Sequence, residues 1–346
     1  MATTVKPLVT DLASTLNHVP SNFIRPIGDR PDLQLLSSTN DFIPIIDLQG
    51  LDSSNRSEII QKIAHTCQNY GFFSSIIVNH GVPEEVLGDM MNVSKEFFNM
   101  SESERKKSYS EDLLKPTRLS TSFNVKTEKV SNWRDFLRLH CHPLEDYVHE
   151  WHANPPSFGD DVAEYSKQLR NLALRLLEAI SESLGLEKDY INKALGKHGQ
   201  HMAINYYPPC PEPELTYGLP AHADPNVITI LLQNDVVGLQ VLKDGKWVTI
   251  NPVPNTFIVN IGDQIQVISN DRYKSVLHRA LVNSEKERMS IPTFYCPSPD
   301  AIMKPAPQLI DNDHPAQYKE FEYNEYFKKF WNRGLSKETC VDMFKA

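Results

Sequence analysis

The first part of the chain, up to about residue 200, repeats its hydrophobic positions every three or four residues. This period is typical of amphipathic helices that bury one face. The segments with this pattern predict three helices, at 59–70 with Gly71 as a cap, at 83–98 beginning with Pro83, and at 162–180 closed at Gly185. Two short hydrophobic runs, at 43–48 and 71–82, predict buried strands beside these helices.

After about residue 200 the pattern changes to short runs rich in β-branched and aromatic residues, separated by turn residues. These runs predict strands at 227–232, 239–242, 247–250, 257–261, 276–282 and 291–296. Asp244 and Gly245 lie between two of them and are typical of a tight hairpin. Because no helical pattern separates these strands, an antiparallel barrel or jelly roll is favoured over βαβ units. A helix with an aromatic face from Tyr323 to Trp331, ended by Gly334, then closes the chain.

Composition narrows the classes of protein. The chain has 346 residues, of which 40% are hydrophobic and 23% charged, so it can bury a substantial core without crosslinks. A net charge of −9 and the lack of a long basic run argue against a nucleic-acid partner. Five widely spaced cysteines without a C-x-x-C pair suggest neither a disulfide framework nor a zinc knuckle. With no recognisable targeting segment and no run of ~18 apolar residues, we expect a cytoplasmic protein without a membrane partner.

The candidate chemistry lies in the β-rich half. His222 and Asp224 are two residues apart, so on an extended segment they share a face. His278 lies in a later strand-like run, and if the two segments are neighbours, all three side chains converge. Two histidines and one carboxylate form the facial triad that suits Fe(II) and oxygen chemistry. An isolated H-x-D tripeptide is weak support for a metal site, because a single histidine is more often packed or exposed.

Two further motifs strengthen this interpretation. Arg288 and Ser290 again share one face of a strand, and a guanidinium with a nearby hydroxyl can hold a carboxylate. Asn205 and Tyr207 offer an amide and a phenol just upstream of His222. Each motif has an ordinary alternative, since Arg288 could form a surface ion pair and the tyrosine could simply pack. Their occurrence together and in this order is harder to attribute to chance.

Together these motifs resemble the plant iron(II)/2-oxoglutarate-dependent dioxygenases. The matching segments are 205–211, 222–224, 278 and 288–290, with 43–47, 71–73 and 79–81 in the first half. The resemblance therefore spans nearly the whole chain. One departure is that five residues, 74–78, separate Gly-Phe-Phe from Asn-His-Gly, where the family usually has about three. An even insertion preserves the face that each strand residue meets.

The resemblance implies an α+β fold whose core is a double-stranded β-helix, or distorted jelly roll, flanked by helices. It implies a mainly helical region at 1–195, a catalytic jelly roll at 196–305 and a helical extension at 306–346. By the same likeness His222, Asp224 and His278 hold Fe(II) and form the catalytic centre. Arg288, Ser290, Tyr207 and Asn205 bind 2-oxoglutarate, O₂ is consumed, and ascorbate serves as the reductant in an assay. We expect a monomer.

A narrower likeness is to the salicylate 3- and 5-hydroxylase branch of the family. It rests on the segments 117–125, 132–140, 212–220, 261–264 and 274–280. This likeness implies that a small aromatic acid, salicylate, is oxidised to 2,3- or 2,5-dihydroxybenzoate. Phe294, Arg118 and Phe123 are the candidate substrate contacts, with Arg118 meeting the carboxylate. Ordinary core packing is the alternative for both phenylalanines, and a solvated side chain is the alternative for Arg118.

Other functions stay open at this point. A flavonoid oxidase, such as a flavone synthase or a flavanone hydroxylase, would use the same iron site. A non-catalytic binding module could retain the barrel, although it would not need every triad residue and Arg288. A zinc hydrolase is disfavoured because no separate general-base motif such as H-E-x-x-H occurs.

Overall fold

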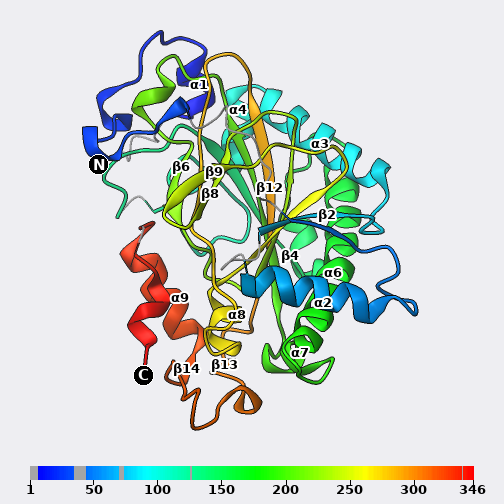
Figure 1. The fold of residues 1–346 in the computed structure, drawn as a ribbon. Helices are drawn as coiled ribbons and strands as arrows, with labels where there is room; N and C mark the ends of the chain where they lie inside the picture. Colours follow the sequence, from blue (N-terminus) through cyan, green and yellow to red (C-terminus); the bar gives the residue numbers. More distant parts are fainter. Residues whose placement is uncertain (1–6, 35–43, 70–73, 125–126, 337) are drawn as a thin grey trace.

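The computed structural model describes residues 7–34, 44–69, 74–124, 127–336 and 338–346. Two β-sheets form the core of the molecule, and helices pack around them (Figure 1). The larger sheet has eight strands in the order β1-β2-β10-β7-β12-β5-β4-β3, and the smaller has four in the order β6-β11-β8-β9. This arrangement confirms the predicted α+β fold with a double-stranded β-helix core.

The strands are short and mostly antiparallel. Those of the large sheet are β1 (Ile45–Asp47), β2 (Ser74–Val78), β3 (Arg118–Ser120), β4 (Asp135–His142), β5 (Gly199–Tyr207), β7 (Ile228–Gln233), β10 (Phe257–Ile261) and β12 (Arg288–Cys296). Those of the small sheet are β6 (Leu219–His222), β8 (Leu239–Lys243), β9 (Lys246–Thr249) and β11 (His278–Ala280). A separate two-stranded antiparallel sheet pairs β13 (Ile302–Met303) with β14 (Phe321–Glu322).

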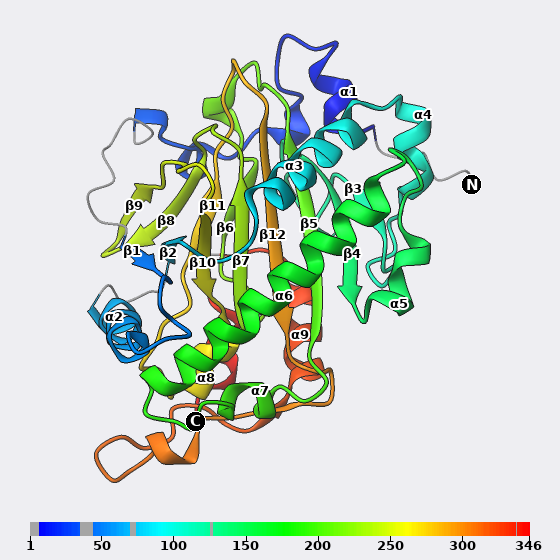
Figure 2. The same ribbon diagram turned by 90° about the vertical axis from the view of Figure 1, so that its right-hand side faces the viewer.

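The helices surround this core. They are α1 (Val9–Ala13), α2 (Arg56–Asn69), α3 (Glu84–Asn99), α4 (Glu102–Arg105), α5 (Leu144–Tyr147), α6 (Phe158–Ser183), α7 (Tyr190–Ala194), α8 (Asp263–Ile268) and α9 (Tyr323–Arg333). Figure 2 shows α6 crossing one face of the large sheet beside α3, whereas α9 lies on the opposite side of the strands. The buried stripe of α6, which includes Leu169, Leu172 and Leu176, joins the main hydrophobic core. The buried residues of α9, Tyr323, Tyr326 and Phe330, join the same core from the other side.

Most predicted elements are present, with differences in extent. The hairpin between β8 and β9 has Asp244 and Gly245 at φ 48° and 75°, which is the left-handed backbone that this tight turn requires. The run at 276–282 forms only the short β11, and the last predicted strand begins earlier, at Arg288. Strands β3, β4 and β5 and helix α8 are among the elements that were not predicted. The predicted cap at Gly71 lies outside the described residues.

The first half of the chain contributes directly to the large sheet. The five residues of the family departure, Ser74–Val78, are strand β2, which pairs in parallel with β1 and antiparallel with β10. On the other edge, β4 pairs with β5 and extends the sheet to β3. Four of the eight strands therefore precede residue 195, so the sheet extends beyond the predicted catalytic region. The three-part division of the chain stays a prediction.

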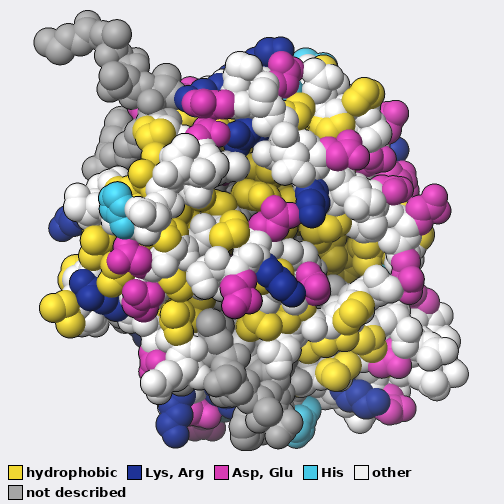
Figure 3. All heavy atoms as spheres, turned by 90° about the horizontal axis from the view of Figure 1, so that it is seen from above, with side chains coloured by type: hydrophobic (Ala, Val, Ile, Leu, Met, Phe, Trp, Pro, Cys, Tyr) yellow, Lys and Arg dark blue, Asp and Glu magenta, His cyan; other side chains and the backbone are white. Residues whose placement is uncertain are grey.

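The surface mixes both signs of charge. Figure 3 shows acidic and basic side chains interspersed with hydrophobic ones on the face at the top of Figure 1. Several exposed pairs, such as Lys62 with Glu58 and Lys329 with Glu325, are one helical turn apart with 2.8 Å between nitrogen and oxygen. Such exposed pairs stabilise the fold only slightly. Within the described residues, no helix combines the length and the apolar character needed to cross a bilayer.

Candidate active site

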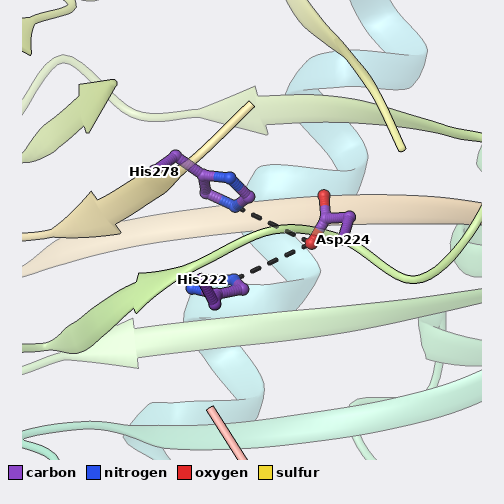
Figure 4. Close-up of side chains that lie close together, drawn as sticks. All are labelled: His222, Asp224 and His278. Carbon is purple, nitrogen blue, oxygen red and sulfur yellow. Dashed lines mark ion pairs between the residues drawn. The ribbon is translucent and has the colours of Figure 1, made fainter. Parts of the chain in front are cut away.

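Strand pairing in the small sheet brings the three triad residues together. In the register between β6 and β11, His222 lies directly opposite His278. Asp224 follows β6 by two residues, and its Oδ1 lies 3.7 Å from the Nε2 atom of each histidine (Figure 4). The three ligand atoms all lie within 4.8 Å of one another, so a single metal ion could contact all of them.

Hydrogen bonds on the far side of each triad residue set its orientation. His222 Nδ1 lies 2.8 Å from the Pro220 carbonyl oxygen, and His278 Nδ1 lies 3.2 Å from that of Val276. A protonated Nδ1 can donate to these oxygens, which leaves both Nε2 lone pairs free to bind a metal. Thr229 donates to Asp224 Oδ2 over 2.6 Å, so Oδ1 remains available. Burial lowers the pKa of His222, favouring the neutral imidazole that binds metal. This donor set fits Fe(II).

A second group of polar residues lies on neighbouring strands of the large sheet. The register between β5 and β12 places Arg288 opposite Tyr207 and Ser290 opposite Asn205. The amide nitrogen of Asn205 lies 3.5 Å from the Ser290 hydroxyl, and the Arg288 guanidinium lies 5.2 Å from the Tyr207 ring centre. The four residues that motif spacing grouped are thus brought together by one pair of strands.

Arg288 is a buried cation with unused hydrogen-bonding capacity. Its side chain is 1% exposed, and Nη2 donates to the Gln233 amide oxygen over 2.8 Å. Its Nε and Nη1 have no hydrogen-bond partner in the described part of the chain. Gly238 makes room for the side chain, because a Cβ at that position would lie 2.6 Å from Arg288 Cδ. A buried guanidinium with two free donors could hold one carboxylate group of 2-oxoglutarate.

The triad and this polar group face a common cavity of about 130 Å³ between the two sheets. Both predicted phenylalanine contacts line it. Phe294 stacks on His201 with ring centres 4.9 Å apart, and Phe123 stacks on Trp331 at 4.2 Å. Trp331 belongs to α9, so the C-terminal helix supplies part of the cavity wall.

Comparisons with known proteins agree with this geometry. The 2OG-Fe(II) oxygenase superfamily model matches residues 198–297, and the model described as the N-terminal region of non-haem dioxygenases in morphine synthesis matches residues 43–158. The Arabidopsis thaliana protein DMR6-LIKE OXYGENASE 2 is 62% identical over 99% of this chain and 98% of its own length. The chain belongs to the 2OG-Fe(II) oxygenase superfamily.

Other relatives place the oxygenase among plant enzymes. It is 54% identical to Protein DOWNY MILDEW RESISTANCE 6 of Arabidopsis thaliana, over 94% of this chain and 95% of the relative. It is similar in structure to JOX2, solved in complex with 2OG, Fe and JA, with a TM-score of 0.89 and 37% identity over 99% of this chain and 98% of that one. The oxygenase is therefore a dioxygenase that requires Fe(II), 2-oxoglutarate and O₂.

In the oxygenase, the Arg118 side chain lies outside this cavity. This position differs from the expectation that Arg118 contacts the substrate carboxylate. Its side chain is fully buried, and its Nε donates to the Ser110 carbonyl over 2.9 Å. Its Nη2 donates to the Ser122 carbonyl and to the Ser120 hydroxyl. Arg118 is not among the cavity-lining residues in the described part of the chain. Its donors tie together the loop that follows β3, which is a structural task.

Three other arginines of the described chain, Arg134, Arg138 and Arg279, line this cavity, and the sequence analysis assigned none of them to the site. Arg134 precedes β4 and donates from Nη1 to the Asn205 amide oxygen over 2.7 Å. Arg138 lies in β4, and its Nη2 donates to the carbonyls of Leu113 and Lys115 at 2.7 Å each. The signal was the alternation of Arg134, Phe136 and Arg138, which puts all three on one face of an extended segment.

Proposed function

We propose that this dioxygenase hydroxylates salicylate to a dihydroxybenzoate at an iron held by His222, Asp224 and His278. The observation that carries the proposal is one small cavity combining the triad, a buried arginine with free donors, and a wall of aromatic rings. When bound, Fe(II) supplies the activation of O₂ that couples decarboxylation of 2-oxoglutarate to oxidation of the substrate. The remaining tasks belong to the side chains of the protein.

In this proposal the polar residues of β5 and β12 orient the cosubstrate. Arg288 offers Nε and Nη1 to the distal carboxylate of 2-oxoglutarate, and the Ser290 hydroxyl adds a donor. Tyr207 and Asn205 lie opposite these two residues and limit where the carboxylate can sit. When this carboxylate is fixed, the other end of 2-oxoglutarate points toward the triad. The binding contacts therefore orient the cosubstrate for the reaction.

The substrate would lie against the aromatic wall. Phe294 and Phe123 can pack on the faces of a benzene ring, and Arg138 is the cation that we assign to the salicylate carboxylate in place of Arg118. The Nε of Arg138 is buried and has no hydrogen-bond partner among the described residues. A carboxylate taken out of water needs such a partner.

Oxidation of a flavanone is the second candidate. Flavanone 3-dioxygenase 2 of Oryza sativa subsp. japonica is 50% identical over 97% of both chains. The test is to incubate the iron-loaded enzyme with salicylate and with naringenin in parallel, and to follow succinate and the aromatic products. We expect salicylate to be consumed faster. Consumption of naringenin alone would replace the first proposal by the second.

A further inference from the structure

A second and larger cavity, of about 750 Å³, adjoins the one that holds the triad. The two cavities share four lining residues, Arg138, His201, Phe327 and Trp331. The second cavity lies where β4, β5 and β12 end, because the paired residues His142 and Gln200, and the paired residues Cys296 and Gly199, line it. Neither the triad nor Arg288 lines it, so the reaction chemistry leaves it without a function.

The lining of the second cavity is positively charged. Arg138, Arg170 and Lys197 line it, and no aspartate or glutamate does so within the described ranges. Arg170 uses Nη2 on the His198 ring nitrogen at 3.3 Å, while its Nη1 is buried and lacks a hydrogen-bond partner among the described residues. Carboxylates such as Asp300 lie near enough to interact with Lys197 but do not line the cavity. The lining thus favours an anion.

The other lining groups offer flat rings without charge. Burial, together with nearby arginines, lowers the pKa of His140 and of His198 to about 4 each, so both rings are neutral near pH ~7. Tyr147 stands edge-on to His140 with ring centres 5.2 Å apart. The stack continues from His140 to His201 at 5.7 Å and from His201 to Phe294, which lines the inner cavity. A row of rings therefore leads from the second cavity to the first.

We propose that the second cavity binds an aromatic carboxylate outside the iron cavity, with Arg170 and Lys197 holding the carboxylate and the His140 and Tyr147 rings contacting the aromatic part. An inorganic anion would use the cations but not the rings. Arg138 and Trp331 belong to both cavities, so a molecule moving between them meets a cation and an aromatic surface throughout. The proposal concerns a class of ligand, and it does not depend on which aromatic acid the enzyme oxidises.

Calorimetric titration with benzoate tests the site in the iron-loaded enzyme, saturated with 2-oxoglutarate and kept free of O₂. The variant is Arg170→Gln with Lys197→Gln. The control is Lys167→Gln with Lys193→Gln. Both lysines are exposed, Lys167 in α6 and Lys193 in α7, and replacing them changes the net charge by the same amount. One equivalent of benzoate should bind at least ~10-fold more weakly to the variant and normally to the control. Unchanged 2-oxoglutarate affinity, set by Arg288, shows that the variant is folded.

The opposite results are equally clear. If the variant and the wild type bind the same number of benzoate equivalents with the same affinities, the second cavity is not an anion site. Displacement of the variant-sensitive benzoate by inorganic phosphate at equal concentration would overturn the assignment to an aromatic carboxylate. Product assays with salicylate are read separately: no hydroxylated product, with the benzoate site intact, refutes the proposed function and leaves this inference standing.

Discussion

Replacing Arg288 by glutamine should weaken 2-oxoglutarate binding while leaving the folded protein intact. The guanidinium is buried, and two of its donors have no partner within the described chain, so its charge is balanced only when an anion binds. Losing a charge-assisted contact costs roughly 1.5–3 kcal/mol, which corresponds to ~10- to 150-fold in affinity. Without cosubstrate the variant should be at least as stable as the wild type, because a buried uncompensated charge has been removed.

The assay is urea unfolding of the iron-loaded enzyme without O₂, with and without 2-oxoglutarate. At a concentration ~100 times the wild-type Kd, the cosubstrate should raise the free energy of unfolding by about 2.7 kcal/mol. The same concentration should raise that of Arg288→Gln by only about 0.3–1.4 kcal/mol. Arg118→Gln is the matched control, since it removes a second fully buried arginine that lies outside the cavity. Arg118→Gln should have a lower free energy of unfolding, but 2-oxoglutarate should still raise it by the full wild-type amount. If 2-oxoglutarate raised the free energy of unfolding of Arg288→Gln by the full amount, the assignment of Arg288 to the cosubstrate carboxylate would be refuted.

Three further predictions follow from the same geometry. Asp224→Ala removes the one anionic ligand atom, so Fe(II) binding and succinate formation should collapse while circular dichroism stays unchanged; near-normal turnover would disprove the triad. Arg138→Gln should raise the KM for salicylate ~10-fold or more without changing that for 2-oxoglutarate, and equal effects on both would show that Arg138 only supports the fold. His140 has a pKa of about 4 in the folded protein, so the unfolded chain takes up a proton first as the pH falls below ~6.5. Between about pH 7 and about pH 5, the free energy of unfolding should therefore fall by up to about 2 kcal/mol less in His140→Gln than in the wild type. Urea unfolding at each pH measures this difference.

Much of the site could be predicted because its residues lie at strand periodicity. His222 and Asp224 are two positions apart, as are Arg288 and Ser290, and strand pairing needs only to align the segments. The convergence itself could not be derived from spacing alone. It depends on the registers between β6 and β11 and between β5 and β12, which are long-range contacts.

The predictions that failed concern residues whose surroundings are set by tertiary contacts. Strand β4 was missed although Leu137, Leu139 and Cys141 alternate with Arg138, His140 and His142, because these polar side chains face cavities that the sequence alone does not show. Arg118 was selected from its segment, but backbone carbonyls of Ser110 and Ser122 take up its donors. Arg118 and Arg138 lie opposite each other in the pairing of β3 with β4, so which of them reaches the cavity depends on their tertiary contacts.

Identification of the product is the most direct test of the central claim. The enzyme would be incubated with salicylate, Fe(II), 2-oxoglutarate, ascorbate and O₂, and the dihydroxybenzoates and succinate would be quantified by chromatography. The account predicts a 2,3- or 2,5-dihydroxybenzoate formed in equal amount to succinate, and neither product in Asp224→Ala. Succinate released while salicylate remains unchanged would contradict the proposed substrate.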